Sequence, residues 1–215
     1  MSGSEHTYTR RTWMRRTAMG LALVSTLSLT ACDGSWNPMQ PKAVQFNAID
    51  ITGASYAKDF SLPDATGRIR SMAEFKGKVV FVFFGFTQCP DVCPTTMAEL
   101  AQVRKQLGPQ ADLLQGVFIT LDPERDSSTM LRDYAQGMDP SFLGLRGSPE
   151  QTAELAKSFK IFYQKVPSPS GEGYTIDHTA GAYVFDKQGH VRLFVRYGQG
   201  ADKLLADIKT LLAER

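Results

Sequence analysis

The sequence predicts an α/β domain in which a mixed β-sheet is flanked by α-helices on both faces. Two apolar runs, at 79–86 and 113–121, have the length and composition of strands that are covered on both sides. Each run is followed by a segment with helical periodicity. The chain then ends with two strand-like segments around a glycine turn and one more helix. This order of strands and helices indicates a mixed sheet with helices on both faces.

Residues 1–31 are predicted to be a targeting segment that lies outside the fold. Four arginines within 10–16 precede a short apolar stretch at 18–31, which is shorter than the ~20 residues of a membrane span. The stretch ends in Leu-Thr-Ala-Cys at 29–32, which resembles the lipobox of bacterial lipoproteins. That resemblance implies that Cys32 becomes the first residue of the mature protein and carries lipid. The alternatives are an uncleaved anchor and an ordinary signal peptide with an incidental cysteine.

Residues 32–44 are predicted to be a flexible tether that precedes one domain at 45–215. The tether is polar and contains two prolines. The 184 residues from Cys32 onward suit a single domain, which usually has ~100–200 residues. They hold 20 of the 24 basic and 21 of the 22 acidic residues, a net charge of −1. The basic character of the whole chain thus belongs to the targeting segment, and nothing indicates nucleic-acid binding.

The first part of the domain is predicted to form an N-terminal β extension. Short strands are expected at 46–53 and 60–62, and the sequence Asp-Ala-Thr-Gly at 64–67 is typical of a turn. A helical turn is expected at 72–75.

The apolar run at 79–86 leads into a loop that contains Cys89 and Cys93. Pro94 is expected at the first helical position, where its missing N–H has no cost, and Gly108 is expected to end the helix. Because Pro90 and Pro94 bias the residues before them away from helical geometry, both cysteines are expected on the loop, with Cys93 near the helix N-cap. A helix N-terminus favours a thiolate. Two such thiols indicate redox or metal chemistry.

In the second half of the domain, the sequence predicts strands and helices that alternate. They are a strand at 113–121, a charged loop at 122–126, a helix at 128–136, a strand at 142–145, a capping box at 148–151 that opens a helix to about 160, a loop at 167–173, strands at 182–186 and 191–197 that form a hairpin, and a helix at 201–213.

A Cys-x-x-x-Cys pair that opens a helix after a central strand, with a hairpin and a last helix further on, resembles the thioredoxin superfamily. Within it, the chain closely resembles the SCO/SenC family of copper proteins, which assemble cytochrome c oxidase. Three segments carry the match in the family's order: FGFTQCPDVCPTT at 84–96, TLDPERD at 120–126 and DHT at 177–179. The resemblance covers about 60–212. It implies a thioredoxin-like fold and copper ligands at Cys89, Cys93 and His178.

The chemistry of these residues agrees with copper. Thiolates suit Cu(I), and imidazole suits both Cu(I) and Cu(II). Two sulfurs and one nitrogen leave a coordination position open, which a delivery protein needs. Of the other histidines, His190 is expected to be solvated in the hairpin turn, and His6 belongs to the targeting segment.

Other roles for the same residues stay open. One alternative is that the two cysteines form a structural disulfide or are two buried thiols. Another is that His178 is a hydrogen-bonding residue in a loop. Asp177 either orients His178 or is an exposed loop carboxylate. Asp122 lies just past a predicted strand end but is not included among the ligands.

The expected function is delivery of copper to the binuclear copper centre of cytochrome c oxidase subunit II. The alternative is a thiol–disulfide oxidoreductase in which Cys89 and Cys93 reduce the copper-ligand cysteines of that subunit. General reductases of the thioredoxin type use Cys-x-x-Cys and a proline before the hairpin, whereas this chain has a longer spacing and no proline at 177–181. A peroxiredoxin has Thr or Ser where Pro90 stands. A copper-responsive redox sensor is the non-catalytic alternative.

The lipobox and Asp33, which resembles an inner-membrane retention signal, imply a location on the bacterial inner membrane with the domain facing the periplasm. Expected partners are subunit II and either another periplasmic copper carrier or a thiol reductase.

Overall fold

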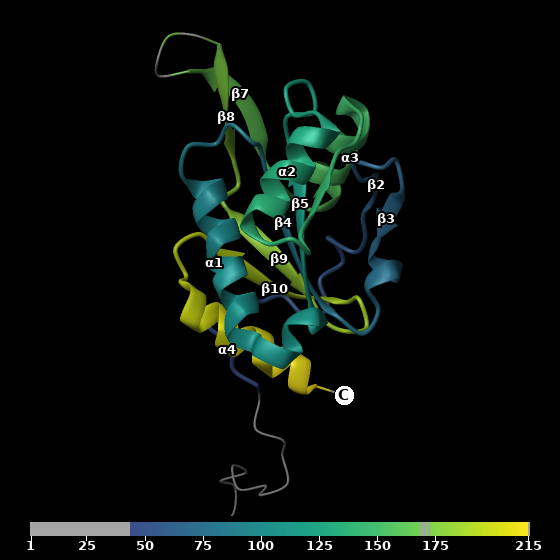
Figure 1. Cartoon of the computed structure of the whole chain (residues 1–215), viewed down its shortest axis with the longest axis vertical. Helices are drawn as coiled ribbons and strands as arrows, with labels where there is room; N and C mark the ends of the chain where they lie inside the picture. The colour runs from purple at the N-terminus through teal and green to yellow at the C-terminus, as the bar shows by residue number, and fades with distance from the viewer. Residues whose placement is uncertain (1–43, 169–170, 172, 215) are drawn as a thin grey trace, which may run out of the picture. The chain divides into compact units, whose positions relative to one another are not determined.

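The centre of the fold is a six-stranded mixed β-sheet (Figure 1). The computed structural model describes residues 44–168, 171 and 173–214, so Cys32 and the predicted targeting segment lie outside the described residues. The sheet has the strand order β1-β10-β9-β4-β5-β6. Its strands are β1 (Ile49–Asp50), β4 (Val79–Gly85), β5 (Leu114–Thr120), β6 (Leu143–Leu145), β9 (Gly181–Phe185) and β10 (Val191–Arg196). β4, β5 and β6 run parallel, whereas β9, β10 and β1 pair antiparallel.

The two apolar runs of the sequence form the central strands β4 and β5. Every residue of both strands is buried. Because side chains alternate along a strand, Phe81 and Phe83 enter one core cluster, and Val80 and Val82 enter the other. The prediction of a sheet covered on both faces is therefore confirmed.

Helices cover each face of this sheet. The cluster around Phe83 contains side chains of α1 (Val92–Leu107), α2 (Ser128–Met138) and α4 (Ala201–Ala213). The opposite cluster contains side chains of α3 (Pro149–Ser158) and of the 3₁₀ turn η1 (Met72–Phe75). A second 3₁₀ segment, η2 (Gly108–Leu113), follows α1. The capping box that opens α3 is present as predicted, because Ser148 and Gln151 each accept a hydrogen bond from the other's main-chain N–H.

Two small antiparallel sheets accompany the central one, and the sequence predicted only one of their four strands. β2 (Ser61–Pro63) corresponds to the strand expected at 60–62, and it pairs with β3 (Ile69–Ser71). β7 (Tyr163–Pro167) pairs with β8 (Tyr174–His178), so the loop expected at 167–173 lies between two strands. No residue of β3 is buried, and only one residue of β7 and β8 together is buried. These strands were missed because exposed, polar strands lack the apolar pattern from which strands are predicted.

The strand predicted at 46–53 is much shorter in the structure, since only β1 pairs there. In the part of the chain that the structure describes, no helix has both the length and the apolar character that a membrane crossing requires.

Candidate metal centre

The two cysteines lie where the central strand β4 gives way to helix α1. Cys89 is half-buried in the connecting loop, and Cys93 is completely buried. The helix begins at Val92, so Cys93 is its second residue and Pro94 its third. The predictions that Pro94 opens the helix and that Cys93 stays on the loop were therefore wrong. The first four N–H groups of a helix have no acceptor within it, so proline is tolerated at the third position as well as the first.

His178 is the last residue of strand β8, so the alternative of a histidine in a loop does not apply. Its ring meets Phe83 and Phe86 edge-on, with centroid distances of 6.3 and 6.0 Å. Its Nδ1 lies 3.0 Å from the main-chain oxygen of Thr179. A carbonyl oxygen only accepts hydrogen bonds, so Nδ1 carries the proton and the Nε2 lone pair is left free. Nε2 lies 3.9 Å from Sγ of Cys93.

Cys89, Cys93 and His178 together form a cluster with the geometry of a metal site. Their three ligand atoms all lie within 4.8 Å of one another. Three donors spread evenly at ~2.3 Å around one ion lie ~4.0 Å apart, so the cluster needs to close by less than ~1 Å. Two sulfurs and one imidazole nitrogen suit Cu(I) and Zn²⁺ and do not suit Mg²⁺ or Ca²⁺.

The two thiols differ in acidity. The hydrogen bond with Cys93 lowers the pKa of Cys89 to about 4, and hydrogen bonds from main-chain N–H groups act in the same direction against partial burial. One of these N–H groups is that of Cys93, 3.4 Å from Sγ of Cys89, at the start of α1. The hydrogen bond with Cys89 and complete burial raise the pKa of Cys93 far above its usual range. At neutral pH the pair therefore holds one thiolate, on Cys89.

Gly85 makes room for the buried cysteine. A Cβ atom at this position would lie 2.7 Å from Sγ of Cys93 and 3.0 Å from the ring of Phe118. Any other residue at 85 would force the sulfur or the rings of Phe118 and Phe83 to move. Glycine is therefore needed at position 85 because the sulfur of Cys93 approaches the strand closely there, and not because of the backbone conformation of residue 85.

Asp126 anchors the cysteine loop, a role that the sequence reasoning missed. Its carboxylate is almost completely buried. It accepts hydrogen bonds from the N–H and hydroxyl of Thr87 at 3.1 and 2.5 Å, and from the hydroxyl of Thr120 at 2.6 Å. Thr87 precedes Cys89 by two positions. The only sequence signal was that Asp126 ends the segment TLDPERD, one of the three that carried the family resemblance.

The other two aspartates considered from the sequence have different environments. Asp177 is exposed, and its side chain has no hydrogen bond or ion pair among the described residues. It does not orient His178, because the partner of Nδ1 is Thr179. Asp122 is buried and pairs with Arg125.

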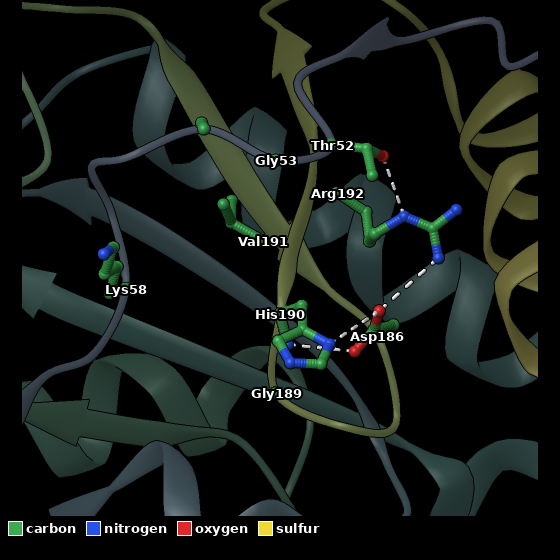
Figure 2. A pocket seen from close by; sticks show the side chains of 9 residues that line it. Thr52, Gly53, Lys58, Asp186, Gly189, His190, Val191 and Arg192 are labelled. Atoms are coloured by element: carbon green, nitrogen blue, oxygen red, sulfur yellow. Dashed lines mark hydrogen bonds and ion pairs between the residues drawn. The ribbon is translucent and has the colours of Figure 1, made fainter.

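A hollow of about 460 Å³ lies elsewhere, at the turn between β9 and β10 (Figure 2). It shares no residue with the cysteine–histidine cluster. Phe185, at the start of this turn, pairs with Val80, so the hollow lies at the end of β4 opposite the cysteine loop. Figure 2 shows contacts among three of its polar side chains and Thr52: Asp186 contacts His190 and Arg192, and Arg192 donates to Thr52. This hollow is therefore not part of the candidate metal centre.

Fold and site together define a thioredoxin-like domain that carries a two-thiol, one-imidazole metal site of the kind that suits a soft metal ion. The family model SCO1/SenC matches residues 50–213, and the chain belongs to this family.

Relatives agree with this assignment. The mitochondrial protein SCO2 homolog of Bos taurus is 36% identical over 157 residues, which cover 72% of this chain and 59% of the bovine protein. The chain thus spans less than two thirds of that relative's length. The solution structure of apo Sco1 from Thermus thermophilus has a TM-score of 0.69 and 37% identity, covering 80% of this chain and 99% of the other. The copper-bound structure of ScoI from Bradyrhizobium japonicum has a TM-score of 0.64 and 36% identity, covering 71% and 97%.

Proposed function

We propose that Cys89, Cys93 and His178 bind one copper ion and that the domain delivers it to the binuclear copper centre of cytochrome c oxidase subunit II. The observation that carries this proposal is the meeting of two thiols and one imidazole from segments 85 positions apart in the sequence. The donor set alone suits both copper and zinc. The copper-bound structure of the Bradyrhizobium relative, at 36% identity, favours copper. The family resemblance supports the oxidase as the recipient.

The accessibility of the three residues supports delivery rather than storage. Cys93 is completely buried, whereas Cys89 and His178 are partly exposed. A thiolate of the recipient can therefore approach from the side of Cys89 and His178 and fill the open coordination position. Metal ligation requires deprotonated thiols, so binding by both cysteines releases the proton that Cys93 holds in the apo protein.

Copper titration of His178→Ala tests the site. With thiols reduced, the wild-type chain is expected to bind one copper ion, and the variant is expected to bind at least ~10-fold more weakly, because only two donors remain. The measurement is Cu(I) competition with a chelator, together with any Cu(II)–thiolate absorption band. His190→Ala, which changes an exposed histidine at the other end of the sheet, is the control.

The same titration separates the second candidate function, reduction of the oxidase's cysteines. A half-exposed thiolate at Cys89 beside a buried thiol at Cys93 is the arrangement of an attacking and a resolving thiol, which favours this alternative. A reductase does not need His178. Equal copper binding by wild type and His178→Ala would therefore overturn the proposed ligand set and place the reductase function first.

We also propose that residues 1–31 are a lipoprotein signal peptide, 32–44 a tether, and 45–215 the copper-binding domain. A compact unit that begins at Gln45 supports the last boundary. Lipid on Cys32 would hold the domain at the periplasmic face of the inner membrane, beside the oxidase. One acyl chain binds membranes only weakly, so the several chains of bacterial lipoproteins would be needed.

Changing Cys32→Ser is expected to remove the lipid and to move most of the protein from the membrane fraction to the soluble periplasmic fraction. Fractionation and immunoblotting measure this shift. Recovery of the variant in the membrane pellet, in the same proportion as wild type, would contradict lipid anchoring at Cys32.

A further inference from the structure

The hairpin that carries His178 is not part of the central sheet. β7 and β8 form a two-stranded sheet of their own, and Figure 1 shows them extending past the ends of the central strands. His178 pairs with Tyr163 at one end of the hairpin, and Tyr174 pairs with Pro167 at the other. An isolated hairpin is at best marginally stable, so the direction in which His178 points depends on what holds the hairpin to the domain.

Arg125 links the body of the domain to the hairpin through two contacts with Tyr174. One terminal nitrogen of its guanidinium donates to the main-chain oxygen of Tyr174 at 2.7 Å. The guanidinium also lies over the ring of Tyr174, 3.7 Å from its centroid. Arginine suits such a site because its planar group can stack and donate hydrogen bonds at the same time.

Asp122 contacts both Arg125 and Tyr174. Its carboxylate, 1% exposed, pairs with Nε of Arg125 and accepts a hydrogen bond of 2.9 Å from the hydroxyl of Tyr174. The same terminal nitrogen of Arg125 that contacts Tyr174 also lies 3.2 Å from the side-chain oxygen of Gln88, the residue before Cys89. Arg125 thus touches both the hairpin that carries His178 and the loop that carries Cys89.

We propose that Arg125, held by Asp122, is a positioning residue that fixes the hairpin through Tyr174 and so places His178 opposite the two cysteines. This inference deepens the proposed function and rests on it. Tyr174 and His178 are four residues apart on one strand, about 13 Å. A small rotation of the hairpin at Tyr174 would therefore move the imidazole away from Cys93.

Other contacts hold the hairpin near His178, where Tyr163 packs against both core clusters and the imidazole meets Phe83 and Phe86. Arg125 and Asp122 hold the opposite end, at Tyr174. The ion pair between Lys165 and Glu124 is exposed, with 45% and 58% of the side chains accessible, and such pairs contribute little. Ile176 is buried in the core and keeps the middle of β8 against the domain. This single apolar contact restrains the middle of the strand, whereas the hydrogen bonds of Arg125 and Asp122 restrain its Tyr174 end.

The test compares Arg125→Met with wild type in two measurements on the full chain in detergent. In the apo protein, hydrogen exchange of the β7 and β8 amides is expected to become about 10-fold faster. In the reduced protein, Cu(I) affinity is expected to fall about 10-fold or more. The same substitution is then made in His178→Ala, where it is expected to change Cu(I) affinity less than 2-fold, because Arg125 acts through His178.

Two further variants keep the test decisive. Tyr174→Leu removes the stacking ring and its hydroxyl but leaves Arg125 paired with Asp122 and bonded to the main-chain oxygen of residue 174. It is expected to change hydrogen exchange and affinity in the same direction as Arg125→Met, by a smaller factor. If Arg125→Met does not fold, Tyr174→Leu tests the positioning role in its place. Glu124→Gln removes the exposed ion pair of the same hairpin and leaves Lys165 over the ring of Tyr174. It is expected to change neither hydrogen exchange nor affinity.

The outcomes for Arg125 and for the copper site are distinguishable. Unchanged amide exchange in the hairpin, or an equal loss of Cu(I) affinity with and without His178, would overturn the positioning role. If instead wild type and His178→Ala bind copper alike, the proposed ligand set fails. Hydrogen exchange of the apo protein then still decides whether Arg125 holds the hairpin.

Discussion

Replacing Cys93 by serine is expected to abolish tight copper binding, and Cys89→Ser is expected to do the same. Each change removes one of two soft donors and puts in its place a hydroxyl that stays protonated at neutral pH. A loss of at least ~100-fold in Cu(I) affinity is expected, the upper end of what loss of a supporting residue alone causes. Competition with a Cu(I) chelator, and copper content after gel filtration, measure the change.

The control for these variants is Met130→Leu, which removes an exposed sulfur of α2 that is not in the cluster. Its copper stoichiometry and affinity should equal those of wild type. One copper ion bound with wild-type affinity by either serine variant would show that the ligands lie elsewhere.

Asp126→Ala is expected to lower the free energy of unfolding by about 3 kcal/mol, because it leaves the partly buried donors of Thr87 and the buried hydroxyl of Thr120 without their charged acceptor. For a domain of this size, that corresponds to a fall of roughly 6–12 °C in Tm. Copper affinity should fall as well, since Thr87 holds the start of the cysteine loop. Thermal unfolding followed by circular dichroism measures the stability, and chelator competition the affinity.

Asp177→Ala is the matched control for Asp126. This aspartate is exposed and its side chain has no partner among the described residues, so its removal should change stability by less than ~0.5 kcal/mol. If the two variants unfolded at the same temperature, the proposed anchoring role of Asp126 would be wrong.

Local patterns predicted most of the fold. The buried runs became β4 and β5, the capping box at Ser148 opened α3, and the last helix has the predicted bounds, Ala201–Ala213. These elements depend on burial periodicity and on capping within a few residues, so they can be predicted from a single sequence. The start of α1 was missed by two residues, because proline is compatible with any of the first helical positions.

The strands of the His178 hairpin were missed for a different reason. Four of the five residues of β8 and all residues of β7 are not fully buried. The sequence of these strands therefore shows no alternation of apolar and polar residues from which a strand could be predicted. Only the resemblance of the segment DHT to the family's motif marked His178 as a ligand candidate.

The sequence by itself determined the fold class, the family and the identity of the three candidate ligands. Each of these depends on local periodicity or on short motifs. The tertiary structure decided that His178 faces Cys93 across 85 positions, and that Gly85 gives the sulfur its space. It also decided that Asp126 and Arg125 hold the cysteine loop and the hairpin in place. These contacts join residues far apart in the chain, and long-range contacts follow from how the packed elements meet, which no local pattern encodes.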